Sequence, residues 1–377
     1  MLNVAIRISS LIFLGPEASR NPDWHRVTKQ YATNLMLAGR ALWFWPQFLQ
    51  PLVHWFLPGC RSLRAQLREA CNIIQPIVDK KRAEETTSTK RSDNLVAWMD
   101  EISRGRPFDA ALSQIASSFA AIHTTSNSLT QLLVDLCNDP ELIDSLRKEV
   151  ITVITSEGWK RSALQNLKLM DSVMKESQRL NPSVIGEFFR YTSVFMITRW
   201  FLPLSLLFPF FFLSSCRIGY KFFPFRPRRI QALTHVTVSM RRKALEDIRL
   251  HDGLEIPKGA FICVSSHQMW DPTIYSEPEK FDGHRFLKRS QIQGHEKDSQ
   301  FAATSVDHVG FGHGTLACPG RFFAGDVMKV VLCHMLLKYD WEIQEGYKPL
   351  VLKAGVRFVV DPATKLLIRR RQEEIPM

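Results

Sequence analysis

The stretch "FGHGTLACPGRFFA", Phe311 to Ala324, constrains the chain more than any other. It places three glycines around a single cysteine, Cys318, and then continues into a helix-like run. Glycine lets a backbone approach a bound group closely, and a cysteine at the start of a helix can ionise. A thiolate presented in this way suits a soft metal ion, whereas a free cysteine taken alone is most often a small buried hydrophobe. The rest of the chain has to decide between the two.

Composition narrows the class of protein. The chain has 377 residues, 45% of them hydrophobic, which is enough for a sizeable core in one large domain or two ordinary ones. Its net charge of +12 suits nucleic acid, an anionic membrane or an acidic protein, but no Lys/Arg block is interleaved with aromatics, so we expect no nucleic-acid partner. The seven cysteines are scattered without a CxxC pair, which indicates a reducing compartment and no disulfide framework.

The first 180 residues have the periodicity of helices. The segment Thr28–Leu57 predicts a buried or membrane-facing helix pair broken at Pro46 and Pro51. The other predicted helices are Arg61–Glu85, Phe108–Asp139, one that starts near Pro140, and Ala163–Leu180. A surface loop through Asp93 is predicted after Arg61–Glu85, and Asn181–Pro182 is predicted to end Ala163–Leu180.

The pattern of apolar and polar residues changes after Arg242. Short alternating runs between Leu245 and Met269, punctuated by glycine and proline, predict short strands, and Val351–Arg370 predicts a final hairpin. The fold class predicted from these patterns is mainly α with a small β portion.

The segment Gly186–Gln231 fits neither pattern. It is rich in Phe and crossed by prolines, and its run Val194–Cys216 approaches the length of a membrane span. Arg199, Pro203 and Pro209 interrupt that run.

Four separated motifs occur in order along the chain. They are "AAIHTTS" with Thr124 and Thr125, "KESQR" with Glu176 and Arg179, "FDGHRF" with Arg285, and Phe-x-x-Gly-x-x-x-Cys-x-Gly with Phe311, Gly314, Cys318 and Gly320. In this combination the chain resembles the cytochrome P450 family, and most closely its fungal members of secondary metabolism. The resemblance covers nearly the whole chain except Gly186–Gln231 and implies the cytochrome P450 fold.

The resemblance assigns roles in the cysteine stretch. Cys318, as a thiolate, would be the axial ligand of the iron of haem b. Gly314 and Gly320 would let the loop pass close beneath the porphyrin, and Phe311 would shield the sulfur.

The other motif residues receive supporting roles from the same resemblance. Glu176, Arg179 and Arg285 would form an ion-paired triad that braces the haem-binding side, although a Glu-x-x-Arg pair is also an ordinary helix salt bridge. Arg242 would contact a haem propionate; its alternative is a surface charge.

Two residues of the predicted central helix would handle protons. Thr124 matches the threonine that the family uses to organise protons at the haem. His123 occupies the position of the family's usual acid, where an imidazole can relay protons or can be a satisfied core histidine.

The chain departs from the family pattern in three places. Leu316 stands where the family has Arg or His, which would weaken haem binding. The chain starts late relative to the family, so residues 1–377 would form a single domain that is incomplete at the amino terminus. The segment Gly186–Gln231 would be an insertion, either a retained intron or a membrane-associated element.

The resemblance implies a haem-thiolate monooxygenase that oxidises a hydrophobic, terpenoid secondary metabolite. Electrons would come from NADPH through cytochrome P450 reductase, and the enzyme would lie on the cytosolic face of the endoplasmic reticulum membrane. Two alternatives stay open: a catalytically incompetent fragment of such an enzyme, and a non-enzymatic haem-binding protein.

Overall fold

The computed structural model describes residues 1–46, 48–87, 95–182, 186–187, 237–297, 299–347, 349, 351–354, 357–361 and 363–375. These residues form two units, which are described separately. The first unit comprises Met1–Met170, Gly320–Tyr347 and Lys365–Met377, and the second comprises Asp171–Pro319 and Lys348–Thr364.

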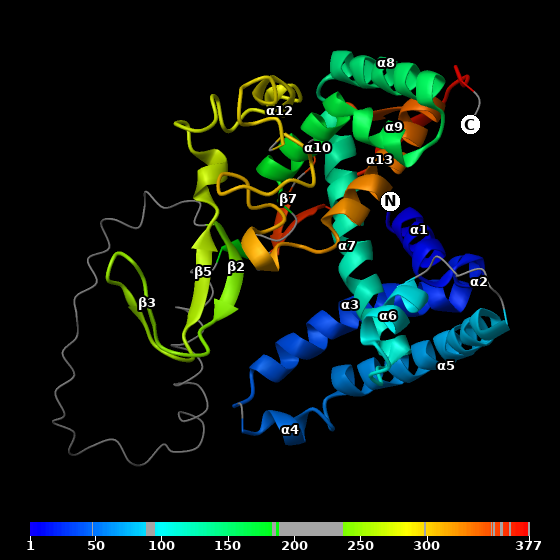
Figure 1. The fold of residues 1–377 in the computed structure, drawn as a ribbon, viewed down its shortest axis with the longest axis vertical. Coiled ribbons are helices and arrows are strands. Elements are labelled where there is room, and N and C mark those ends of the chain that lie inside the picture. The colour runs from blue at the N-terminus through cyan, green and yellow to red at the C-terminus, as the bar shows by residue number, and fades with distance from the viewer. Residues whose placement is uncertain are drawn as a thin grey trace. The chain divides into compact units, whose positions relative to one another are not determined.

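Helices dominate the first unit (Figure 1). They are α1 (Leu2–Leu14), α2 (Pro16–Arg20), α3 (Pro22–Trp43), α4 (Gln50–Val53), α5 (Pro58–Thr87), α6 (Leu95–Ser103), α7 (Ala110–Leu136), α8 (Pro140–Glu157), α9 (Arg161–Asn166) and α13 (Arg321–Lys338). A further helix, α10 (Lys168–Leu180), begins in this unit and continues into the second. Two strands, β6 (Tyr339–Ile343) and β9 (Leu366–Arg370), pair antiparallel after α13.

Local capping explains where the long helices of the first unit begin. The Asn21 side chain accepts hydrogen bonds from the backbone N–H groups of Asp23 and Trp24 and so caps α3. The carboxylates of Asp109 and Asp139 do the same for α7 and α8. Each cap satisfies donors that the first helical turn leaves unpaired, which is why polar residues precede these apolar helices.

One apolar core cluster of the first unit lies where α7 meets α1 and α5. In Figure 1, α3 and α5 run side by side, and α7 crosses this part of the unit. The buried apolar residues packed there are Phe13, Leu14, Ala18, Trp24, Val27, Ala70, Ile74, Val78, Val96, Ala110, Ala111 and Ile115. This packing places the amino-terminal half of α7 against a rigid apolar support.

The second unit carries most of the strands. Its elements are the rest of α10, β1 (Gly186–Glu187), β2 (Thr237–Lys243), β3 (Ile248–Arg249), β4 (Glu255–Ile256), β5 (Phe261–Ser265), η2 (His267–Trp270), α12 (Arg285–Arg289), η3 (Gly314–Leu316), β7 (Val351–Ala354) and β8 (Arg357–Val360). The strands form a three-stranded sheet in the order β1-β2-β5 and two hairpins, β3-β4 and β7-β8. The predicted fold class, mainly α with a small β portion, is confirmed.

Two helix predictions need correction. The predicted single helix Ala163–Leu180 is divided at Leu167, after which a new helix starts because the Glu149 carboxylate accepts hydrogen bonds from the N–H groups of Leu169 and Met170. In the predicted pair Thr28–Leu57, α3 ends before Pro46, and Pro51 lies in the first turn of α4. Pro51 therefore starts a helix, as proline does well at that position, and does not break one.

The predicted final hairpin is correct only in part. Strands β7 and β8 form it, but β9 pairs with β6 because Tyr339–Ile343 supplies a free edge immediately after α13. The segment Gly186–Gln231 lies outside the described residues except for Gly186 and Glu187, which pair with β2. Among the helices of the described residues, none combines the length and the apolar character needed to cross a bilayer.

Candidate functional site

The loop of Cys318 in the second unit closes on itself through its backbone. The N–H of Cys318 donates a hydrogen bond to the carbonyl of Phe311, with an N···O distance of 2.8 Å. Between these two residues the chain makes a single turn of 3₁₀ helix, η3. The thiol of Cys318 is half-buried, so it is held in place without being sealed off.

Glycines make this closure possible. Gly312 and Gly314 have φ angles of 72° and 73°, in the region that favours glycine. Gly320 has φ −84°, which any residue adopts. A Cβ on Gly310 would lie 2.5 Å from Oε1 of Gln178, so a larger residue there would have to displace the Gln178 side chain. The sequence reasoning missed Gly310 and Gly312, although Gly312 lies inside the stretch that it singled out.

A haem can fit the loop only if the outer side of the loop is open, and His313, Gly314, Thr315 and Leu316 are all exposed there. An added Cβ on Gly314 would meet nothing within 4 Å, and the side chain of Leu316 is 68% exposed. In the described part of the chain, no cluster of three or more His, Cys, Asp or Glu residues could hold a metal ion. A single thiol beside an exposed loop face suits a flat macrocycle that brings its own ligands to the metal, as haem does.

The predicted triad is assembled in the second unit and is deeply buried. The Glu176 carboxylate accepts two hydrogen bonds from Arg179, at 2.8 and 2.9 Å, and one from Nε of Arg285 at 3.0 Å. Glu176 and Arg179 are fully buried. Arg179 also donates to the carbonyl of Met269 at 2.6 Å, and its guanidinium lies 5.0 Å from the centre of the Tyr275 ring.

Other polar side chains of α10 bind the loops around it. The Ser172 hydroxyl donates to the Gly283 carbonyl and accepts from the N–H of Leu287. The ammonium group of Lys175, which is 1% exposed, donates to the carbonyls of Gln300 and Ala303 at 3.1 and 3.0 Å. The sequence reasoning missed both residues, because nothing local distinguishes a polar residue that binds a distant loop from one that faces water.

His308 is a buried histidine that the motif analysis did not single out. Its Nε2 lies 3.3 Å from the carbonyl oxygen of Lys175 and donates to it, since a carbonyl can only accept. Its ring meets the Phe286 ring edge-on, with 5.6 Å between the ring centres. Burial, together with the charge of Lys175, holds the pKa of His308 well below its ordinary value. The ring is therefore neutral at physiological pH.

Arg242 lies on β2, where it pairs opposite Ile262 of β5. The register of the two strands shifts between Ser239 and Arg242, and the Arg242 side chain is exposed. Its assignment to a propionate stays a prediction.

Thr124 and His123 belong to the first unit, on α7, and not to the unit that holds Cys318. The Thr124 hydroxyl donates to the carbonyl of Ala120 at 2.7 Å. The His123 ring lies tilted against Phe119, with 6.3 Å between the ring centres. The proton-handling roles of both residues stay predictions.

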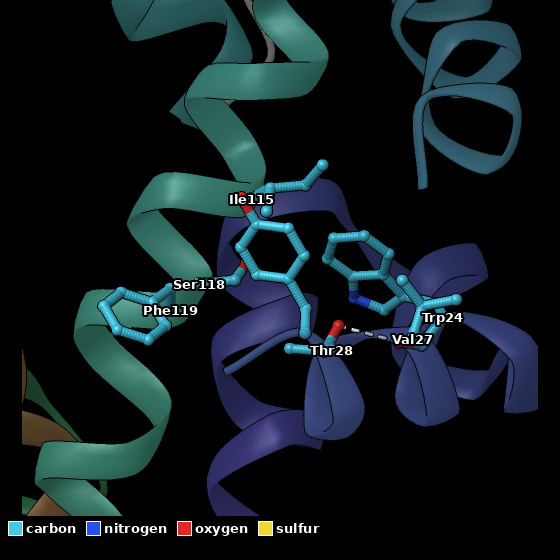
Figure 2. Close-up of a pocket in the computed structure, with 7 residues that line it drawn as sticks. Trp24, Val27, Thr28, Ile115, Ser118 and Phe119 are labelled. Carbon is cyan, nitrogen blue, oxygen red and sulfur yellow. Dashed lines mark hydrogen bonds between the residues drawn. The ribbon is translucent and has the colours of Figure 1, made fainter. Parts of the chain in front are cut away.

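A small cavity lies beside these residues, between α3 and α7 (Figure 2). Its volume is about 10 Å³, at the lower limit for one water molecule. The hydroxyl of Thr28 donates to the carbonyl of Trp24 at 2.7 Å, and the Ser118 hydroxyl is buried with no hydrogen-bond partner among the described residues. The lining residues are Trp24, Val27, Thr28, Tyr31, Ile115, Ser118 and Phe119.

Comparison with known proteins gives a consistent set of matches. The model of the family "Cytochrome P450" matches residues 7–194 and 230–368. The chain is 38% identical over 374 residues to the cytochrome P450 monooxygenase ntnM of Nectria sp and 40% identical over 382 residues to adrA of Penicillium rubens. It is 38% identical over 383 residues to pyr3 of Aspergillus fumigatus.

These alignments cover 99–100% of the chain but only 62–64% of each of the three relatives. The chain therefore spans a little under two thirds of their length. The family match leaves out residues 195–229, which fall within Gly186–Gln231, and the nature of that segment stays a prediction.

Proposed function

Because the chain belongs to the cytochrome P450 family, we propose that it is a haem-thiolate monooxygenase that inserts one oxygen atom of O₂ into a hydrophobic, terpenoid secondary metabolite. The observation that carries the proposal is the loop of Cys318, a half-buried cysteine on a closed backbone turn whose outer face is exposed. A haem bound there supplies the activation of O₂ and its transfer to a C–H bond. The substrate class rests on the resemblance of the motif set to fungal enzymes of terpenoid oxidation.

In this proposal Cys318 binds the iron as a thiolate, and the chain controls the direction of its sulfur. The hydrogen bond from its N–H to Phe311 fixes the backbone on one side of the cysteine. Arg242, exposed on β2, would bind a propionate carboxylate. The triad of Glu176, Arg179 and Arg285 keeps the supporting side of the unit in one arrangement.

Thr124 and His123 would hold and move protons. The Thr124 hydroxyl donates its proton to the Ala120 carbonyl, so its oxygen can still accept a hydrogen bond from a proton donor. The His123 imidazole can take a proton at one ring nitrogen and release one from the other.

The basic balance of the chain, +12, supports a reductase as the electron donor, because an acidic partner is attracted to a basic surface. We place the protein on the cytosolic face of the endoplasmic reticulum membrane. The support is an apolar surface around α4, where aromatic side chains are exposed, Phe48 to 80% and Phe56 to 72%. The exposed aromatic residues there are Phe44, Trp45, Phe48, Trp55 and Phe56.

Cosedimentation with phosphatidylcholine vesicles that contain phosphatidylserine tests the membrane contact. We expect the chain to pellet with the vesicles and the double variant Phe48→Ser, Phe56→Ser to stay in the supernatant, since large apolar side chains supply the partition energy. Equal pelleting of the two proteins would remove this surface from the proposal.

A carbon monoxide difference spectrum of the reduced, haem-loaded chain tests the central proposal. We expect the strongly red-shifted Soret band of thiolate ligation in the wild type and in Cys263→Ser, a control at another half-buried thiol of the same unit, but not in Cys318→Ser. The thiolate band in Cys318→Ser, or no haem uptake by a folded chain, would refute it. Consumption of O₂ that depends on NADPH and reductase then separates a monooxygenase from a protein that only binds haem.

A further inference from the structure

Phe301 is a buried aromatic residue outside every motif of the sequence. Its side chain is 1% exposed, and its ring meets the ring of Phe311 edge-on, with 5.1 Å between the ring centres and 75° between the ring planes. Edge-to-face contacts of this kind orient two rings as well as hold them together. The orientation of the Phe311 side chain thus depends on where Phe301 lies.

The backbone around Phe301 is held by two buried side chains of α10. The N–H of Phe301 donates to the carboxylate of Asp171 at 3.3 Å. Lys175 donates to the carbonyls of Gln300 and Ala303, one on each side of Phe301. Asp171 and Lys175 are four residues apart and therefore share one face of α10. Because buried charged groups must keep their hydrogen-bond partners, these contacts hold Phe301 firmly.

Beyond Phe311 the chain has little stiffness of its own. Gly312 and Gly314 carry no side chain and have positive φ angles, so they leave the turn to Cys318 with more freedom than any other residue would. The contact that closes this turn is the hydrogen bond from the Cys318 N–H to the Phe311 carbonyl. This hydrogen bond therefore links the backbone position of Cys318 to that of Phe311.

We propose that Phe301 is a positioning residue that fixes Phe311 and, through it, the backbone of Cys318. The contacts form a continuous path: α10 holds Phe301, the Phe301 ring holds the Phe311 ring, and the Phe311 carbonyl holds the Cys318 N–H. The functional meaning of this path rests on the proposed role of Cys318 as the haem ligand. The path itself is a property of the chain alone.

The rate at which iodoacetamide alkylates Cys318 in the full, haem-free chain tests the path, with each cysteine followed by peptide mass spectrometry. We expect Phe301→Leu to raise the Cys318 rate about threefold to tenfold, the factor that the loss of one aromatic pair gives. Cys263 in the same unit, and Cys333, whose pKa burial raises to about 12, should react at unchanged rates. A parallel rise at Cys263 would mean general loosening and would overturn the proposal.

Phe286→Leu is the matched control. Phe286 is as buried as Phe301, at 2% exposure in the same unit. Its ring contacts Tyr275, His308 and, at 5.2 Å from the ring centre, the ammonium group of Lys175, whose hydrogen bonds to Gln300 and Ala303 the change leaves in place. This variant should lower the unfolding temperature as Phe301→Leu does and leave the Cys318 rate unchanged. An equal rise at Cys318 in the control would overturn the proposal. If Phe301→Leu folds poorly, Phe301→Met removes the ring at less cost in volume and gives the same test.

A double-mutant cycle shows whether Phe301 acts through Phe311. In a Phe311→Leu background the further change Phe301→Leu should leave the Cys318 rate unchanged, because the contact is already lost. A second, additive increase would mean that Phe301 acts by another route and would overturn the proposal. In the haem-loaded chain, Phe301→Leu should also convert the thiolate-type Soret band to the non-thiolate form sooner. If the chain takes up no haem, the proposed function fails while the alkylation result still decides the role of Phe301.

Discussion

Replacing Glu176 by glutamine removes one negative charge from the most deeply buried ion pair of the second unit. The carboxylate accepts hydrogen bonds from Arg179, from Arg285 and, at 3.2 Å, from the N–H of Asp282. Glutamine keeps the shape of the side chain. Its NH₂ group, however, is a hydrogen-bond donor that would face the N–H donors of a guanidinium group, and two donors cannot bond to each other. Two arginine cations would then lie in a buried site without their counter-charge.

The size of the loss follows from what remains around the two arginines. Removing one partner of a buried ion pair costs about 3–5 kcal/mol. Arg179 keeps the Met269 carbonyl and the Tyr275 ring, and Arg285, which is 11% exposed, keeps the carbonyls of neighbouring loop residues. Because these contacts remain, we expect Glu176→Gln to lower the free energy of unfolding by about 3 kcal/mol, near the lower end of that range. This is a large part of the 5–15 kcal/mol that stabilises a typical domain.

Urea unfolding, followed by tryptophan fluorescence and circular dichroism, measures this loss. The control is Glu277→Gln, which removes the charge of an exposed pair with Lys280 in the same unit, both side chains being about 70% exposed. The control should unfold at the wild-type midpoint, because exposed pairs contribute little. If the free energy of unfolding of Glu176→Gln lies within about 1 kcal/mol of the wild-type value, with an unchanged m-value, the buried pair does not stabilise the unit as argued.

Three further predictions follow from single buried contacts. Below about pH 6.5, His308 is protonated in the unfolded chain but stays neutral in the folded chain, so the free energy of unfolding should fall as the pH falls. In the wild type this fall should be steeper than in His308→Gln by up to about 1.4 kcal/mol per pH unit. Urea titrations across pH 5–7 would measure both slopes. Ser118→Ala should raise the free energy of unfolding by about 1 kcal/mol, because it removes a buried hydroxyl without a protein partner; a loss of stability would reveal a water bound in the cavity. Gly310→Ala should lower the unfolding temperature by pushing against Gln178, and Gln178→Ala should restore it; a Gly310→Ala protein as stable as the wild type would refute the close approach.

The long helices α5, α7 and α8 were predictable from the sequence because their causes are local. The 3.6-residue apolar period and the caps at Asp109 and Asp139 all lie within the segments that they define. The division at Leu167 was not predictable, because the side chain that binds the start of α10 is Glu149 on α8, which α9 separates from α10 in the chain. Strand β9 was misassigned for the same reason, since its partner precedes it by more than 20 residues.

The candidate site shows the same division. Cys318 and Gly314 belong to one short stretch whose spacing points to a ligand loop, and the triad could be placed once the resemblance supplied its partners. The residues that hold the loop from outside, Phe301 and Lys175, carry no local signature. Their roles depend on contacts more than 100 residues apart along the chain, such as that between Lys175 and Ala303.

The polarity of α10 explains how these distant contacts arise. In most buried helices apolar side chains pack against apolar side chains. In α10, however, five of the seven residues from Asp171 to Ser177 are both polar and buried, and the other two are Val173 and Met174. Several of them bind backbone groups of loops that have no ladder of their own, and a buried backbone group without a partner is costly. The helix therefore supplies the hydrogen bonds that a sheet would otherwise provide. A polar-to-apolar change on α10 should consequently loosen the segment that leads to Cys318 before it unfolds the helix itself.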